Sequence, residues 1–568
     1  MALRIALAQI GTTVGDLAAN VESVLTWSAR AAEAGAQVVV FPEMTLTGYP
    51  VEDLALRASF QRAAGDAAQD LARRLAERGL ADVPVVVGTL GAADPGTPGA
   101  LPRNRAVVLL HGSVVGSQDK RFLPNYGVFD EFRIFAPGTS STVFTAGGRS
   151  LSLAICEDIW QDENIPSVVG GAPLDALLVL NGSPYEQGKG HVRLELARRR
   201  AAQAGMPVVY VNLVGGQDDL VFDGGSFVVM PDGTLVAQAP RFVEHLLLWD
   251  LPAAGEPVAL SEIAPELDPV EEVYRAATLG LADYARKSGF RSVVLGMSGG
   301  IDSALVATMA ADALGGENVV GLAMPSMYSS QHSLDDAADL ARRLGASYRL
   351  VPIAPMVDSF QSHLGFDGVA AENLQARVRG VIVMGVSNQE GHLALATGNK
   401  SELAVGYSTI YGDAVGGYAP LKDIDKSLVW QLARWRNDRA IDDGDIPPIP
   451  ESSITKPPSA ELRPGQVDQD SLPAYHLLDE VLDAYIEHAE GRVELIERGF
   501  DPETVDKVVS LVDRAEWKRR QYPLGPKVTS LAFGRDRRLP VTSRWREPEA
   551  PSATTGGTTS TTNPAEES

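Results

Sequence analysis

The sequence contains a single cysteine, Cys156, among its 568 residues. An intramolecular disulfide is therefore excluded, and the composition fits the reducing cytoplasm, which we expect as the location. Basic residues are also scarce: 49 Lys and Arg stand against 73 Asp and Glu, so the formal net charge is −24. A chain with this charge repels phosphate backbones and anionic membranes, and no Lys/Arg block offers a local exception. We therefore expect neither nucleic acid nor a membrane as a partner.

Long apolar runs are absent as well, since no stretch approaches the roughly 20 residues of a membrane span. Residues 2–10 lack the features of a secretory signal and predict a buried first strand that ends at Gly11. The phosphate loop G-x-x-x-x-G-K-[ST] does not occur anywhere. What remains is an ordinary globular composition, with 45% apolar and 21% charged residues, over a length that predicts more than one domain.

Short apolar runs alternate with amphipathic stretches through residues 1–250, which we interpret as the first domain. The predicted strands are residues 38–41, 85–88, 106–110, 151–155, 176–180 and 208–211. Residues 17–34 and 60–78 predict helices, and a Pro-Asp-Gly turn within residues 227–236 predicts a hairpin. This pattern is typical of a layered α/β domain with some antiparallel pairing.

The composition changes at residues 251–269, which are rich in Pro, Ala and Glu and which we interpret as a linker. A second α/β domain is predicted for residues 270–546, because strands and helices alternate again. Its first elements are a helix at 270–289, a strand at 292–295, a helix from Ser303, a strand at 318–323 and a helix at 335–344. Residues 547–568 are dominated by Ser, Thr, Gly and Pro and predict a disordered tail.

Three reactive side chains of the first domain lie in short motifs beside predicted strands. Glu43 ends F-P-E, Lys120 begins K-x-x-L-P, and Cys156 begins C-E-D. Ligands of α/β sheets bind where strands end, so these positions can form a site. Each residue alone also has an ordinary explanation: a solvated glutamate, a surface lysine, or a small buried cysteine.

Together, in this order, the three motifs resemble the nitrilase, or carbon–nitrogen hydrolase, superfamily. The resemblance implies a four-layer α-β-β-α sandwich with a Glu–Lys–Cys triad at the strand ends. Glu43 is then the base that takes the thiol proton, Cys156 the nucleophile that attacks an amide carbon, and Lys120 the group that stabilises the oxyanion. The products are a thioester, which water hydrolyses, and free ammonia.

A glycine-rich turn, S-G-G-I-D-S at residues 298–303, follows a predicted strand and precedes a helix. Glycines let backbone N–H groups approach phosphate oxygens, and a helix N-terminus adds partial positive charge. Ser298 and Ser303 can donate hydroxyl hydrogen bonds, and Asp302 can hold Mg²⁺. The alternative is a tight turn capped by serine. In its strand–turn–helix context the motif predicts a phosphate site.

The turn resembles the pyrophosphate motif of the N-type ATP pyrophosphatases, which cleave ATP between its α- and β-phosphates. Further motifs follow in order: E-N-L-Q-A-R at 372–377, T-G-N-K-S-E at 397–402, Y-G-D at 411–413 and K-P-P-S-A-E-L at 456–462. Singly, Asn399 or Ser401 could only cap a helix and Arg377 could only be solvated. As a set they are similar to the glutamine-dependent NAD synthetase family over residues 2–546. This implies a Rossmann-like parallel α/β domain of the adenine nucleotide alpha hydrolase type in the second half.

The resemblance also implies a role for each matching position. The residues implied for ATP are Ser298, Gly299, Gly300, Ile301, Asp302, Ser303 and Thr397. Those implied for deamido-NAD are Asn373, Arg377, Asn399, Lys400, Glu402, Asp413, Lys426 and Lys518. Those implied for glutamine are Tyr126, Glu157, Ser183 and Lys189. Asp302 and Glu402 are implied to hold Mg²⁺ as the metal cofactor.

The implied reaction converts ATP, deamido-NAD, glutamine and water into AMP, pyrophosphate, NAD and glutamate through an adenylated intermediate. The small molecules are then the partners, together with further copies of the chain in a homo-oligomer. Two rival hypotheses remain: another N-type synthetase, such as a tRNA-modifying enzyme, with a borrowed amidase, or an inactive scaffold built on both folds. The acidity of the chain argues against tRNA, and the intact Glu43, Lys120, Cys156 and Asp302 argue against a scaffold.

Overall fold

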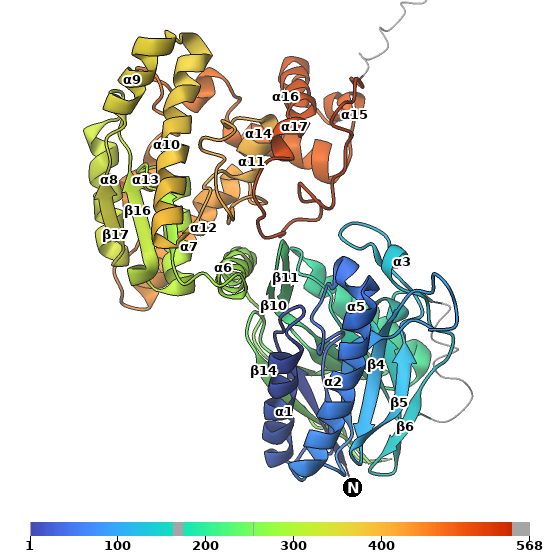
Figure 1. Ribbon diagram of the computed structural model, residues 1–568. Coiled ribbons are helices and arrows are strands. Elements are labelled where there is room, and N and C mark those ends of the chain that lie inside the picture. The colour runs from blue at the N-terminus through green and yellow to red at the C-terminus, as the bar shows by residue number, and fades with distance from the viewer. Residues whose placement is uncertain (1, 163–173, 254, 548–568) are drawn as a thin grey trace, which may run out of the picture.

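The computed structural model describes residues 2–162, 174–253 and 255–547 of the chain. Two α/β units follow one another, drawn from blue to green and from green to red in Figure 1. The first runs from β1 (Leu3–Gln9) to β14 (His245–Leu251), and the second begins at α6 (Pro269–Lys287). The tail that the sequence predicts lies outside the described residues beyond Glu547.

The first unit contains two six-stranded sheets. In one sheet the strand order is β14, β1, β2 (Val38–Val40), β3 (Val85–Gly91), β4 (Arg103–Leu110) and β5 (Ser113–Asp119). In the other it is β13 (Leu235–Gln238), β12 (Phe227–Val229), β9 (Val208–Asn212), β8 (Ala176–Asn181), β7 (Arg149–Ile155) and β6 (Val143–Ala146). The central strands pair in parallel and the outer ones antiparallel, so the predicted hairpin between β12 and β13 is confirmed.

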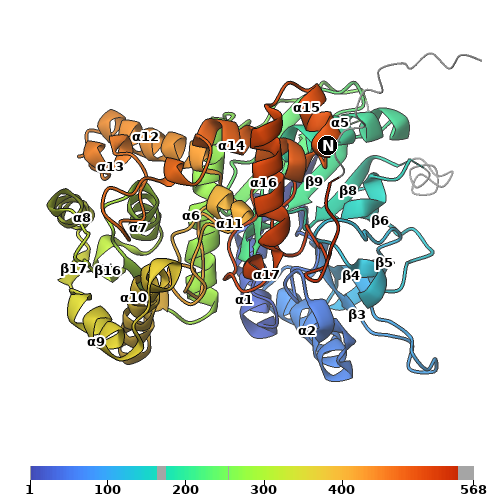
Figure 2. The same ribbon diagram turned by 90° about the horizontal axis from the view of Figure 1, so that it is seen from above.

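Helices cover the outer faces of both sheets. On one side lie α1 (Leu17–Glu33) and α2 (Ala58–Glu77), and on the other lies α5 (Lys189–Ala204), as Figure 2 shows from above. The inner faces of the sheets bury a shared core that includes Leu7 and Leu153. Strands that are covered on both faces consist of continuous apolar runs, and such runs allowed these strands to be predicted from the sequence. The predicted α-β-β-α sandwich is confirmed.

The second unit is built on a parallel sheet in the order β17 (Ser347–Leu350), β16 (Val319–Ala323), β15 (Val293–Gly296) and β18 (Leu393–Ala394). The helix α7 (Ile301–Leu314) follows β15, and α8 (Gln331–Leu344) follows β16. Since β16 and β18 flank β15 on opposite sides, the strand order reverses at its carboxyl end, where such sheets bind ligands. The parallel fold is confirmed, although α7 and α8 begin earlier than predicted, at Ile301 and Gln331.

The rest of the second unit is mainly helical. Its helices are α9 (Ala354–Leu364), α10 (Gly368–Glu390), α11 (Lys400–Val405), α12 (Lys426–Asp442), α13 (Glu451–Thr455), α14 (Tyr475–Leu482), α15 (Arg492–Glu497), α16 (Pro502–Arg514) and α17 (Glu516–Arg519). Helices α11, α14 and α16 share a separate apolar core, so this region packs as its own layer beside the sheet. Within the described ranges, no helix is both long and apolar enough to cross a membrane.

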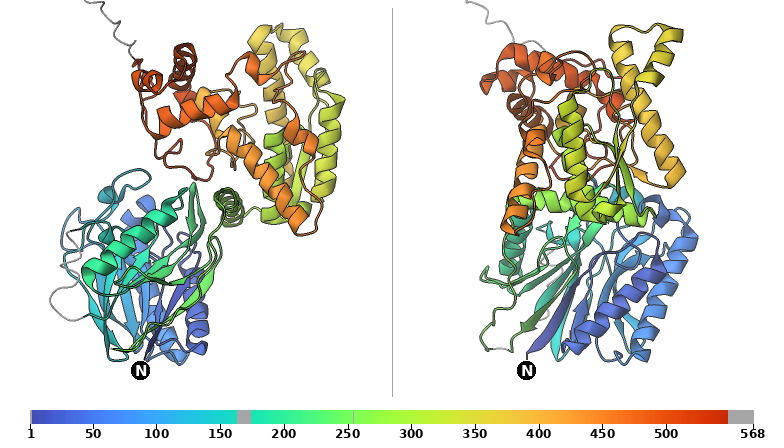
Figure 3. Two further views of the ribbon diagram at one scale, coloured as in Figure 1. Left: turned by 180° about the vertical axis from the view of Figure 1, so that it is seen from behind. Right: turned by 90° about the vertical axis from the view of Figure 1, so that its left-hand side faces the viewer.

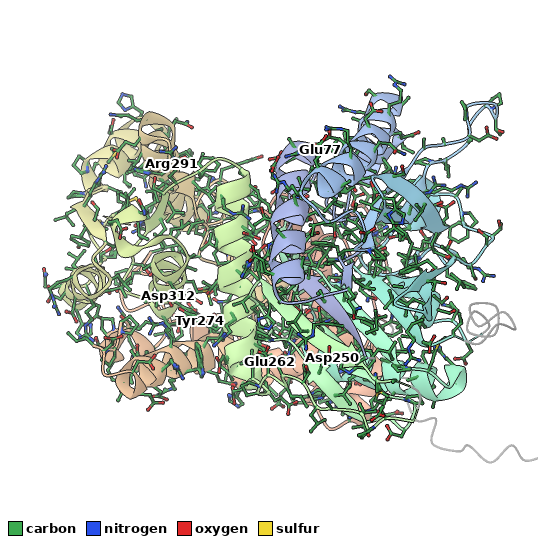
Figure 4. All side chains as sticks on the ribbon, turned by 90° about the horizontal axis from the view of Figure 1, so that it is seen from below. Glu77, Asp250, Glu262, Tyr274, Arg291 and Asp312 are labelled. Atoms are coloured by element: carbon green, nitrogen blue, oxygen red, sulfur yellow. The ribbon has the colours of Figure 1, made fainter. Side chains whose placement is uncertain are left out.

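The helix α6 lies at the junction of the two units, as the rear view in Figure 3 shows. It packs on α7 and α12 of its own unit and on β10 (Val214–Gln217) and β11 (Leu220–Asp223) of the first. Lys287 donates to the Thr12 and Gly216 carbonyl oxygens at 2.7 and 2.6 Å. On its other side the Tyr274 hydroxyl donates to Asp312 at 2.6 Å, and Figure 4 labels both residues. The helix therefore fixes one unit against the other.

Candidate active sites

The predicted triad residues converge in the first unit, each from the end of a different strand. Lys120 follows β5, and its Nζ lies 2.8 Å from Glu43 Oε1, with no exposed surface on either side chain. Glu43 also accepts hydrogen bonds from Asn104 Nδ2 at 2.6 Å and from Gly182 N at 2.7 Å. Cys156 follows β7 and is close enough for the charges of Glu43 and Lys120 to act on its pKa. The structure thus brings all three together.

The backbone of Cys156 adopts a left-handed conformation, with φ of 43°. Such a conformation is uncommon for a residue with a side chain, and strained backbone of this kind clusters at functional sites. Burial, together with the negative charge of Glu43, holds the pKa of the Cys156 thiol well above its ordinary value. The sulfur is therefore a neutral thiol in the resting site, and a base must take its proton for it to react.

A second glutamate, Glu131, belongs to the same site, and the sequence reasoning missed it. It lies on the short helix α3 (Glu131–Ile134), and its carboxylate contacts Lys120 Nζ at 2.9 Å and accepts from the Tyr49 hydroxyl at 2.8 Å. Burial, reinforced by Glu43 and opposed by Lys120, raises the pKa of Glu131 to about 7. A four-residue helix has no apolar period, so the sequence offered no signal for this residue.

Asp158 joins the lysine loop to the cysteine loop. Its carboxylate accepts from the backbone N–H groups of Arg121 and Phe122 at 2.9 and 3.0 Å, and from that of Ile155 at 3.0 Å. Arg121 and Phe122 directly follow Lys120 in the chain, and Ile155 directly precedes Cys156. Burial raises the pKa of Asp158 to about 6 in spite of the three donors. Asp158 therefore fixes the two reactive residues relative to each other.

The residues implied for glutamine surround this centre. The Tyr126 hydroxyl donates to Glu157 Oε2 at 2.9 Å, and both side chains influence Cys156 electrostatically. Lys189 opens α5, and its pKa is lowered by burial and by the nearby Arg193. The Ser183 hydroxyl accepts from Arg193 Nε at 3.0 Å. Polar groups of both charge signs thus lie around the thiol.

In the second unit, the glycine-rich turn lies between β15 and the N-terminus of α7, as predicted. The hydroxyl oxygens of Ser298 and Ser303 are 3.1 Å apart, and Gly300 N donates to Ser298 Oγ at 3.2 Å. Gly299 has φ of 75°, and a Cβ there would lie 2.3 Å from the Ser333 carbonyl oxygen. Only glycine fits this close approach, which leaves the backbone N–H groups of the turn beside the helix N-terminus.

Asp302 and Glu402 face each other across the pocket with Lys426 between them. Lys426 Nζ forms an ion pair with Asp302 and lies 3.5 Å from Glu402 Oε1. Burial, opposed by Lys426 and reinforced by Asp302, raises the pKa of Glu402 to about 8. Asn399 caps α11 and also donates to Asp302 Oδ1 at 2.9 Å. The two carboxylates implied for a metal are therefore neighbours.

A pocket of about 290 Å³ opens above this cluster. Of the predicted residues, those that line it are Ser298, Gly300, Ile301, Asp302, Ser303, Thr397, Glu402, Asp413 and Lys426. Burial raises the pKa of Asp413. Three other predicted residues hold the segment 406–410 beside the pocket. Asn373 accepts from Thr409 Oγ1 at 2.9 Å, and Arg377 donates to the Ile410 carbonyl oxygen. Lys518 donates to the Gly406 and Ser408 carbonyl oxygens.

Lys400, for which the resemblance implies a role at deamido-NAD, does not line this pocket. Its ammonium contacts Asp423 at 2.9 Å, Thr529 Oγ1 at 2.6 Å and Glu487. It lines a different cavity, of about 1280 Å³, whose walls come from both units. The physical reason is helix geometry: Asn399 and Glu402 are three positions apart and share a face of α11, whereas Lys400 points roughly 100° away.

Sequence reasoning missed two cationic residues of the nucleotide pocket. Arg379 lines it from α10 and donates to the Met324 carbonyl oxygen at 3.1 Å. Lys456 lines it from the loop after α13 and donates to Ser333 Oγ. Lys456 begins the motif at 456–462 and Arg379 lies two residues after the motif at 372–377, but neither motif shows which polar residues face inward. No group of three or more metal-ligating side chains occurs in the described part of the chain.

Comparison with known families finds two families, one in each half of the chain. The chain matches the family described as carbon–nitrogen hydrolase over residues 4–256 and the family described as NAD synthase over residues 273–522. Fold and sites thus define a two-part enzyme, in which a carbon–nitrogen hydrolase and an NAD synthase share one chain.

Full-length relatives narrow the class further. The glutamine-dependent NAD(+) synthetase of Acinetobacter baylyi is 44% identical over 549 residues, which cover 96% of this chain and 99% of the relative. That of Rhodobacter capsulatus is 46% identical, with 96% and 99% covered. The chain belongs to the glutamine-dependent NAD(+) synthetase family, and it is a carbon–nitrogen ligase.

Two solved structures also resemble this chain. The glutamine-dependent NAD+ synthetase of Acinetobacter baumannii, in complex with ADP, has a TM-score of 0.75 at 41% identity and covers 97% of this chain and 100% of its own. The synthetase of Cytophaga hutchinsonii has a TM-score of 0.79 at 22% identity, with 96% and 98% covered, and agrees in fold.

Proposed function

We propose that this enzyme amidates deamido-NAD to NAD through an adenylated intermediate, with ammonia released from glutamine by Glu43, Lys120 and Cys156. The observation that carries the proposal is the presence of two complete sites in one chain. One has a buried thiol beside a Glu–Lys pair, and the other has a phosphate turn beside two carboxylates and a lysine. ATP is the co-substrate of the second site.

In the hydrolase site, Glu43 takes the Cys156 proton as the sulfur attacks the glutamine amide carbon. Lys120 keeps a full positive charge for the oxyanion: burial lowers its pKa, but Glu131 and Glu43 outweigh burial and hold the pKa well above its ordinary value. The amide nitrogen takes the proton from Glu43 and leaves as ammonia. Glu43 then activates the water that hydrolyses the thioester.

Recognition of the glutamine head group falls to Tyr126, Glu157, Ser183 and Lys189. Glu157 suits the α-ammonium, and its carboxylate is oriented by the Tyr126 hydroxyl. Lys189 suits the α-carboxylate. Both lie close enough to Cys156 for their charges to act on the same centre.

In the synthetase site, the turn at residues 298–303 and the N-terminus of α7 bind ATP phosphates. The carboxylates of Asp302 and Glu402 converge on the pocket and are hard oxygen ligands, so they fit Mg²⁺. When bound, Mg²⁺ neutralises charge on the pyrophosphate leaving group. Lys426 contacts both carboxylates and limits their repulsion, while Asn399 orients Asp302.

The limits of the domains follow from the division of the chain into a hydrolase part and a synthetase part. Residues 1–250 form the glutaminase, 251–269 the linker and 270–546 the synthetase, in keeping with the two family matches. Ammonia crosses between them within the cavity of about 1280 Å³, whose wall includes Gly188 beside Lys189 and Ser401 beside Glu402. A reactant that is mostly protonated in water at neutral pH gains from such a short route.

The enzyme also assembles with further copies of itself. Support comes from large apolar side chains that α9 and α10 leave exposed: Phe360, Leu364, Val369 and Val381. Sedimentation equilibrium tests this, since a monomer at micromolar concentration would contradict the assembly.

The reaction is tested by following AMP and NAD with either nitrogen source. We expect AMP release from ATP only when deamido-NAD is present, and NAD formation from both glutamine and ammonium salts. AMP release without deamido-NAD would contradict the adenylation step. Failure of glutamine, but not of ammonium, would contradict the glutaminase.

A further inference from the structure

The Lys400 ammonium is buried between two carboxylates that do not belong to either active site. Its partners are Asp423 at 2.9 Å, Glu487, Thr529 Oγ1 at 2.6 Å and the Leu531 carbonyl oxygen at 3.2 Å. Only 7% of Lys400 is exposed. A lysine is rarely buried to this extent unless its partners satisfy it fully, so this cluster has a defined geometry.

The two carboxylates hold one stretch of backbone. Asp423 accepts from the N–H groups of Val528 and Thr529, each at 2.8 Å, and from Thr529 Oγ1 at 2.9 Å. Glu487 accepts from Leu531 N at 2.8 Å. Lys400 therefore anchors the start of residues 527–538, which we call the bridging segment.

The bridging segment continues onto the glutaminase, as the dark-red loop after α17 does in Figures 1 and 3. Its Val528 carbonyl accepts from Gln187 N at 2.9 Å, two residues before Lys189. Arg535 forms an ion pair with Glu52, and Arg538 donates to the Gly127 carbonyl beside Tyr126 at 3.3 Å. The segment thus contacts the loop that carries Tyr126 and the loop that leads to Lys189.

Lys400 itself belongs to α11, the helix that also contributes Glu402 to the nucleotide pocket. Asn399 and Glu402 of this helix contact Asp302 and Lys426, as described above. Lys400 stands between them in sequence but faces the bridging segment. The same helix therefore contributes to the nucleotide pocket on one face and contacts the bridging segment on another.

We propose that Lys400 is a positioning residue that couples the two reactions by anchoring the bridging segment to the ATP-site helix. This inference rests on the proposed function. When Lys400 holds the bridging segment, the loops near Tyr126 and Lys189 keep a fixed position relative to the nucleotide site. Without it, the glutaminase still has its triad but hydrolyses glutamine independently of NAD formation.

The test measures glutamate and NAD together in the full-length enzyme. For Lys400→Met we expect ammonia-driven NAD synthesis within about twofold of wild type, and glutamine hydrolysed per NAD formed to rise at least about threefold, a change typical of energetic coupling between sites. Thr529→Val removes only a hydroxyl of the cluster and should shift the same ratio by a smaller factor. Thr529→Ser keeps the hydroxyl and should restore the wild-type ratio.

Lys507→Met is the control, because it removes an exposed ammonium of α16 that lies outside the bridging segment. It should leave the ratio unchanged. If Lys400→Met does not fold, the Thr529 pair decides the question alone. A wild-type ratio in Thr529→Val, or a raised KM for deamido-NAD with ammonia in Lys400→Met, would overturn the proposal. Loss of glutamine-driven synthesis in wild type itself would instead contradict the proposed function.

Discussion

Each active site contains a buried lysine between two carboxylates, and the two clusters differ in what surrounds them. Lys120 pairs with Glu43 and Glu131, whose side chains are 0% and 4% exposed. Lys426 pairs with Asp302 and Glu402, whose side chains are 19% and 18% exposed and face the nucleotide pocket. In the proposed mechanism, the enclosed cluster holds its charge in place for an oxyanion. The open cluster has carboxylates that can take an additional cationic partner with the substrate.

The comparison also shows how burial sets the chemistry of similar residues. Glu131 and Glu402 both have a pKa raised by burial, to about 7 and about 8. In each case a lysine opposes the effect, so the outcome depends on the second carboxylate beside it.

Cys156→Ala breaks the enclosed site only. Because the nucleophile is lost, glutamine-driven NAD synthesis should fall by about 10³-fold or more. Ammonia-driven synthesis should stay within about twofold, since the phosphate turn lies in the other unit. The measurement is NAD formation with each nitrogen source. Substantial glutamine-driven activity in this variant would remove Cys156 from the mechanism.

Glu402→Gln breaks the open site only. If Glu402 holds Mg²⁺, NAD formation should fall by about 10²-fold or more with either nitrogen source, and the Mg²⁺ requirement should rise. Cys156 should still form a thioester with glutamine, which mass spectrometry detects. The exposed Glu480→Gln is the control. Near-wild-type turnover with ammonia at ordinary Mg²⁺ would leave Glu402 as a helix-terminus charge worth at most about 1 kcal/mol.

Glu131→Gln sharpens the comparison through pH. Wild-type glutamate release should decline as pH falls below about 7, because Glu131, with its raised pKa, then takes a proton and loses its ion pair with Lys120. The variant should be about tenfold slower at pH 8, the cost of one charged hydrogen bond, and should lack this acidic limb. A pH–rate profile of glutamate release checks both. An unchanged acidic limb in the variant would assign it to another group.

Tyr126→Phe is expected to have the smallest effect. It removes the hydrogen bond to Glu157 while keeping the ring. The KM for glutamine should rise about fivefold, the equivalent of about 1 kcal/mol, with little change in kcat. Initial rates at varied glutamine concentration provide the measurement. A fall in kcat without a change in KM would place Tyr126 in the chemical step instead of in binding.

The sequence predicted most of each site because its motifs are local. The turn at residues 298–303 carries its own strand, glycines and helix start. Glu43 and Cys156 follow the buried strands β2 and β7, and Lys120 follows the edge strand β5. Glu131 and Arg379 escaped prediction because they reach their sites from a short helix and from the middle of a long one. Their function depends on which distant group they meet.

The sequence by itself determined the two α/β units, the order of the triad motifs and the phosphate turn, since periodicity and local backbone requirements fix these. Only the tertiary structure decided which side chains of a polar motif share a pocket. In T-G-N-K-S-E, Thr397 and Glu402 line the nucleotide pocket, whereas Lys400 contacts the bridging segment from another face of α11. A run of polar residues does not show in which direction each side chain points. That direction is set by the packing of α11 against α14 and α16, which come from later parts of the chain.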